Sequence, residues 1–280
     1  MIEAWYKLLG IFPFSWTHYN FMNNALLAVL LVTPLFALLG TVVVSNRMVF
    51  FTDVLGHSAL TGIAIGVLLG FHDPTLPMII LAVVLAVSIN LLKNITKSSV
   101  DTVLGVFMAF LVALGIVILS RQGGFVKYTS YLIGDILAVT PKQIAWFFLI
   151  ALVVLIYWYI ASNAMILTSV NPSLARSRRV NTFIIETSFT ILLAIVVIVS
   201  IRLVGILIIN SLLVLPAAAS RNFTRNMHSY TQGAVIISVF SGIVGLIVSY
   251  YWGTASGATI VLFASGCYGI SALLGRHLNK

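Results

Sequence analysis

Charged residues are scarce in this chain: of its 280 residues, 8% are Asp, Glu, Lys or Arg, and just six are acidic. Soluble domains carry about 25% charged and about 45–50% apolar residues. Here 61% of the residues are hydrophobic, and the mean hydropathy is +1.14. A soluble core of this size could not bury so much apolar surface. The composition therefore predicts an all-α polytopic membrane protein.

Several chemical signatures are also absent from the sequence. The single cysteine, Cys267, excludes an internal disulfide. There is no Gly-rich Gly-Lys-Ser/Thr phosphate loop, and no HExxH, GxSxG or CxxC motif. Without these, ATP hydrolysis on such a loop is excluded, and no nucleophile–base set for an intramembrane protease or transferase stands out. The sequence predicts a chain that is not an enzyme and holds no cofactor of its own.

Apolar runs that approach the roughly 20 residues needed to cross a bilayer recur along the chain. The second, third and seventh runs are short, and a broken or re-entrant helix is an alternative for each, so eight to nine transmembrane helices are expected. The candidate spans are about 22–46, 55–70, 76–92, 102–120, 143–163, 183–201, 203–219, 232–251 and 256–275.

The net charge of +9 comes from basic residues scattered through the short gaps between these runs. With the N-terminus outside, ten of the 15 Lys and Arg residues lie on the inner side and five on the outer side. This follows the positive-inside rule and argues against nucleic acid as a partner. The segment 1–20 is rich in aromatic residues, and we expect it to lie at the membrane–water interface. Residues 1–280 as a whole are predicted to form one transmembrane domain.

Asp53 and His57 stand four residues apart in the apolar stretch "FFTDVLGHSALTGIAIG". This spacing puts both on one helix face, and a charge in mid-membrane is costly, so both are functional candidates. A carboxylate and an imidazole suit Zn²⁺, and Mn²⁺ or Fe²⁺ also accept them. The alternative is an Asp–His hydrogen bond that holds two helices together. Two ligands do not close a tetrahedral site, so the others come from elsewhere or from water.

The segment 171–181 differs from the other gaps, because Asn171-Pro172-Ser173 is a helix-start signal before a basic, partly apolar stretch. It is either a docking helix for a cytoplasmic partner or a charged loop that only sets topology. The candidate docking residues are Asn171, Ser173, Leu174, Ala175, Arg178 and Arg179.

Other polar residues are weaker candidates for a transport pathway. Pro216 frees a backbone carbonyl within a span, which can line a pathway or simply kink the helix. Asp101 complements a helix dipole, and Glu186 is expected to reach the interface or to pair with Arg178 or Arg179. The pathway candidates are Asp135, Asn210, Ser211 and Pro216.

Four blocks of the sequence resemble the membrane-spanning permeases of bacterial zinc/manganese ABC importers, most closely the zinc-uptake permeases. They are "NRMVFFTDVLGHSALTGIAIGVLLG", "DTVLGVFMAFLVALGIVIL", "YLIGDILAVTPKQI" and "LVGILIINSLLVLPAAASRNFTRN". The resemblance implies a type II-like importer fold in the bacterial cytoplasmic (inner) membrane. It also implies that Asp53 and His57 meet the transported metal, Zn²⁺ or Mn²⁺.

The same resemblance implies a homodimer around a central pathway, ATPase subunits docked on residues 171–181, and an extracytoplasmic metal-binding protein. Thr61 stands where manganese-type members carry Pro, which favours zinc. Asn46 replaces the first Arg of the usual Arg-Arg pair, and the acidic residues common at the start of the coupling segment are absent. These departures leave the identity of the ATPase partner open.

Three alternatives remain at this stage. A manganese or iron importer of the same architecture differs only in its cargo. A secondary cation transporter would need ion coupling and no ATPase. An intramembrane enzyme would need reactive groups on facing helices, and such groups are scarce here.

Overall fold

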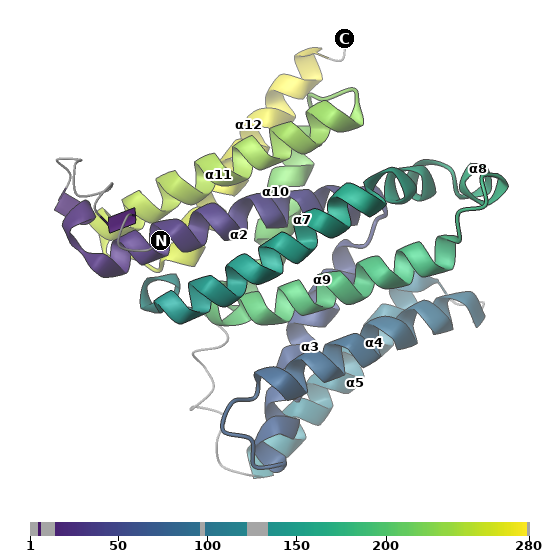
Figure 1. Cartoon of the computed structure of the whole chain (residues 1–280), viewed down its shortest axis with the longest axis horizontal. Coiled ribbons are helices and arrows are strands. Elements are labelled where there is room, and N and C mark those ends of the chain that lie inside the picture. The colour runs from purple at the N-terminus through teal and green to yellow at the C-terminus, as the bar shows by residue number, and fades with distance from the viewer. Residues whose placement is uncertain (1–4, 7–14, 96–98, 122–133, 279–280) are drawn as a thin grey trace. The chain divides into compact units, whose positions relative to one another are not determined.

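The computed structural model describes residues 5–6, 15–95, 99–121 and 134–278. Within these ranges all regular secondary structure is helical, as the sequence predicts (Figure 1). The elements are η1 (Ser15–His18), α2 (Asn20–Ser45), α3 (Val49–Leu68), α4 (Thr75–Ile95), α5 (Val100–Arg121), η3 (Ile136–Ala138), α7 (Pro141–Val170), α8 (Pro172–Ser177), α9 (Thr182–Val204), α10 (Ile206–Arg221), α11 (Met227–Trp252) and α12 (Ser256–Leu278).

Eight of these helices are long and apolar enough to cross a membrane, so the chain is a multi-pass membrane protein. The second and third candidate spans are full helices of 20 and 21 residues, so the alternative of a broken or re-entrant helix does not apply to them. The seventh is short: α10 has 16 residues. At 1.5 Å per residue it is roughly 24 Å long, less than the roughly 30 Å hydrocarbon core.

The helices form two compact units. Unit 1 comprises residues 1–41, 133–153 and 202–280, and unit 2 comprises residues 42–132 and 154–201. In unit 2, α3 packs against both α4 and α5 (Figure 1). Glycines make these contacts close: a Cβ on Gly62 would lie 2.6 Å from the Met78 Cα of α4, and one on Gly115 would lie 2.9 Å from the Thr61 hydroxyl. Small residues therefore bring the backbones of the unit 2 helices together.

In unit 1, α10, α11 and α12 pack against one another. The boundary between α9 and α10 lies at Gly205, which has φ +90°. Gly134, with φ +68°, lies directly against it: a Cβ on Gly134 would be 2.2 Å from the Gly205 nitrogen. The candidate spans 183–201 and 203–219 adjoin near this point. The structure places the break between α9 and α10 at the close contact of Gly134 and Gly205, which we call the glycine crossing.

The first described residues are tied to the start of α2. The Trp5 indole nitrogen donates to the Asn23 carbonyl at 3.0 Å, and the Tyr6 hydroxyl donates to Asn24 Oδ1 at 2.6 Å. Most of the predicted interfacial segment 1–20 lies outside the described residues, so that assignment stays a prediction.

Candidate functional site

Helix α3 carries the ionisable pair Asp53 and His57 on its one open face. Their neighbours Val54, Leu55 and Ala59 are fully buried. The side chains of Asp53 and His57 are 36% and 27% exposed. Because α4 and α5 pack against α3 within unit 2, the pair faces the side of the helix that these two helices leave partly uncovered.

The two side chains lie close together without a hydrogen bond. Asp53 Oδ1 and His57 Nε2 are 3.9 Å apart, beyond the 2.7–3.2 Å range of such bonds. Two ligand atoms that each lie about 2.1 Å from Zn²⁺ at the tetrahedral angle would be about 3.4 Å apart. A small side-chain rotation therefore brings the pair into chelating geometry, whereas the reading of a structural Asp–His hydrogen bond loses support.

The pair does not form a complete metal site by itself. Among the described residues, no three His, Cys, Asp or Glu side chains gather in a group that could hold a metal ion. A tetrahedral site needs four ligands. An ion held by this pair would need further ligands beyond these two side chains.

Thr61 points away from this face. It is fully buried, and its hydroxyl donates to the Leu111 carbonyl of α5. Thr61, which stands where the resemblance implies Pro in manganese-type members, is thus a packing residue between α3 and α5.

Helix α8 begins as the sequence predicts. Asn171 is its N-cap, with an extended backbone (φ −149°, ψ 94°), and its side-chain oxygen accepts from the Leu174 nitrogen at 3.1 Å. Pro172 occupies the first turn, where its missing N–H costs nothing. The result is a six-residue helix between α7 and α9.

Most of the predicted docking residues are exposed on α8 and the turn that follows it: Asn171, Ser173, Leu174, Arg178 and Arg179. Ala175 differs, because it is fully buried. It therefore anchors α8 to the rest of the chain instead of meeting a partner. Arg179 takes a left-handed backbone with φ +61°.

The four pathway candidates lie in unit 1, whereas Asp53 and His57 lie in unit 2. The exposed Asp135 caps η3, accepting from the Leu137 nitrogen at 3.0 Å, which fits an ordinary interfacial role. Asn210 and Ser211 are half-buried on α10, and Pro216 is buried within it. Their place on a pathway stays a prediction.

Sequence reasoning missed a polar cluster between α4 and α9 within unit 2. Asn90 Nδ2 donates to Thr190 Oγ1 at 2.7 Å, and Lys93 Nζ donates to Glu186 Oε2 at 3.0 Å. We call these four side chains the polar clamp. The expected pairing of Glu186 with Arg178 or Arg179 was wrong, because Lys93 is its ion-pair partner. The available signal was Asn90, an amide within an otherwise apolar span.

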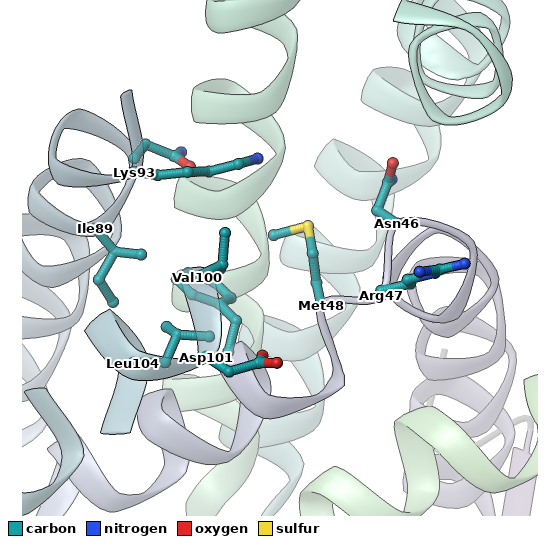
Figure 2. Close-up of a pocket in the computed structure, with 10 residues that line it drawn as sticks. Asn46, Arg47, Met48, Ile89, Lys93, Val100, Asp101 and Leu104 are labelled. Atoms are coloured by element: carbon teal, nitrogen blue, oxygen red, sulfur yellow. The ribbon is translucent and has the colours of Figure 1, made fainter. Parts of the chain in front are cut away.

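A cavity of about 320 Å³ borders the clamp (Figure 2). Asn46 and Arg47 from the α2–α3 turn, Lys93 from α4 and Asp101 from α5 all line it. Asp101 stands in the first turn of α5, where it complements the helix dipole as expected. The predicted inner residues Arg47 and Lys93 thus lie at one end of unit 2, as the orientation with the N-terminus outside requires.

The sequence is similar to those of several known membrane transport proteins. The sequence model of the ABC 3 transport family matches residues 18–275. The high-affinity zinc uptake system membrane protein ZnuB of Haemophilus influenzae is 34% identical over 264 residues, which cover 93% of this chain and 100% of that protein. The manganese transport system membrane protein MntC of Listeria innocua is 25% identical over 255 residues, 91% of each protein.

The fold also matches a solved structure. A chain of PsaBC from Streptococcus pneumoniae in complex with Fab aligns with a TM-score of 0.79 at 24% identity, covering 97% of this chain and 95% of that one. The match extends over nearly the whole of both chains, so the helical architecture is shared from end to end.

Proposed function

Because this chain belongs to the ABC 3 transport family, we propose that it is the permease subunit of an ATP-driven importer that carries Zn²⁺ across the bacterial cytoplasmic membrane. A membrane subunit of this family has no catalytic activity itself, and ATP is hydrolysed on partner subunits. The 34% identity to a zinc uptake protein along its whole length supports zinc as the cargo. The manganese relative is more distant, and Mn²⁺ is the second candidate.

The observation that carries the proposal is the Asp53–His57 pair on the open face of α3. It offers two ligands at a separation of 3.9 Å, in a chain with few other ionisable groups inside its spans. A second copy of the permease related by a two-fold axis would supply the same pair. Two carboxylates and two imidazoles make a tetrahedral set that suits Zn²⁺. The central pathway would then lie between two α3 helices.

Transport follows from alternating access. The extracytoplasmic binding protein releases Zn²⁺ into the outward-open pathway, where the Asp53 and His57 pairs hold it briefly. ATP binding moves the partner ATPases, which pull on α8, and the pathway opens inward. The open, unbonded geometry of the pair suits a transit site, because a site that releases its ion cannot be closed on all sides.

Uptake of radioactive zinc by cells that depend on this permease tests the proposal, with Mn²⁺ and Fe²⁺ as competitors. We expect Zn²⁺ alone to compete at equimolar concentration. Preferential competition by Mn²⁺ would shift the assignment to the second candidate.

Co-purification of an ATPase subunit with the permease tests whether the protein is an ABC transporter. We expect reversal of the charges of Arg178 and Arg179 to weaken this co-purification. If no ATPase subunit co-purified with the wild-type permease, a secondary transporter would be favoured.

A further inference from the structure

The polar clamp connects α4 to α9 within unit 2 by a hydrogen bond and an ion pair. Asn90 is 5% exposed and Thr190 is fully buried, so their 2.7 Å hydrogen bond is shielded from water. The Lys93–Glu186 pair lies one turn further along both helices, at 3.0 Å. Buried amides and membrane charges are costly unless partnered. The two contacts therefore hold the predicted cytoplasmic end of α4 against the first turns of α9.

The clamp joins two segments with different tasks in the proposed function. On one side, α9 begins at Thr182, five residues after α8 ends at Ser177. On the other side, α4 lies in near-backbone contact with α3, where Gly62 faces Met78. Because α3 carries Asp53 and His57, the clamp connects the predicted docking helix to the helix that presents the metal ligands.

The clamped segment of α4 also has room to move. Ile89, Asn90 and Lys93 border the cavity of about 320 Å³, which Figure 2 shows with Lys93 reaching along one side and Arg47 extending away from it. Close-packed interiors resist displacement, because every shift forces neighbouring side chains to repack. A cavity beside the clamp removes that resistance on one side, so a pull from α9 can shift the end of α4.

We propose that the polar clamp transmits the movement of α8 and α9 through α4 to α3, and thereby couples ATP hydrolysis to metal movement. Its four side chains are positioning residues, since they act through α3 and touch no cargo. This inference rests on the proposed importer function. It predicts that breaking the clamp uncouples the transporter, so that ATP is hydrolysed with little metal moved.

The test measures zinc transported per ATP hydrolysed by the complete transporter, with its ATPase and binding protein, in vesicles. Lys93→Glu and Glu186→Lys should each lower this ratio about five- to tenfold, the size of an ordinary coupling effect. The double variant restores the opposite charges and should recover most of the ratio. Tyr157→Phe is the matched control: it removes the 2.8 Å bond from α7 to Ser188 of the same helix α9, and should leave the ratio unchanged.

Thr190→Val provides a second arm that keeps side-chain volume and adds no charge, in case a reversed charge prevents membrane insertion. It removes the 2.7 Å acceptor of Asn90, leaving the more distant Thr187 hydroxyl at 3.5 Å, and should also lower the ratio. A wild-type ratio in Thr190→Val and in both single charge variants would overturn the inference, as would an equal loss in Tyr157→Phe. A wild-type complex that moves none of Zn²⁺, Mn²⁺ and Fe²⁺ would overturn the proposed function, and this inference with it.

Discussion

Replacing Asp53 with Asn separates a transport role of the pair from a structural one. The change keeps the shape of the side chain and removes its negative charge. If the pair held helices together, the protein would lose stability. If it contacts the cargo, stability should be retained and transport lost.

The structure sets the size of both effects. Asp53 Oδ1 and His57 Nε2 are 3.9 Å apart, and their side chains are 36% and 27% exposed. A partly exposed pair of this kind stabilises by at most about 1 kcal/mol. Such a loss lowers the melting temperature by only about 2–4 °C for a chain of this size. For transport, losing a ligand should cost more than the roughly 10–100-fold that loss of an outer-shell partner costs.

The assay pairs zinc uptake at matched expression with thermal unfolding of the purified protein in detergent. Asp53→Asn and His57→Ala should each abolish zinc-dependent growth, while the melting temperature changes by no more than a few degrees. Ser58→Ala, next to the pair but buried and bonded to the Leu55 carbonyl of its own helix, serves as the control and should retain uptake. A large loss of stability with residual uptake in Asp53→Asn would refute the reasoning, because the pair would then be a structural contact.

Substitutions at three further positions test the packing and the docking helix. Gly62→Ala would place a Cβ 2.6 Å from the Met78 backbone, so α3 and α4 must separate. Overpacking of this kind costs about 1–3 kcal/mol of stability. An unchanged melting temperature would contradict the contact. Gly134→Ala combines a 2.2 Å clash with φ +68° and should reduce the yield of folded protein more than Gly62→Ala does; equal yields would argue against the glycine crossing. Asn171→Ala removes the cap of α8, worth about 1 kcal/mol, and should weaken ATPase co-purification, whereas Asn171→Asp should preserve it. If both variants co-purified the same amount of ATPase subunit, the helix cap would not contribute to docking.

The amino-acid sequence by itself determined the class of the protein and the order of its spans. Apolar runs identify membrane helices because the bilayer requires each spanning segment to satisfy its own backbone and to be apolar along its length. The cap of α8 was also predictable, since Asn171 and Pro172 act within one turn of the chain. Asp53 and His57 stood out for the same local reason, as ionisable residues inside an apolar run.

Only the tertiary structure decided which residues meet across helices. Glu186 pairs with Lys93, 93 residues away, although Arg178 and Arg179 are nearer in sequence. Thr61 turns to the Leu111 carbonyl and away from the face that carries Asp53 and His57. Hydropathy and capping depend on neighbours along the chain, whereas these contacts depend on which faces of distant helices pack together. Small residues such as Gly62 and Gly115 allow a close approach, but the sequence does not say which helix each of them meets.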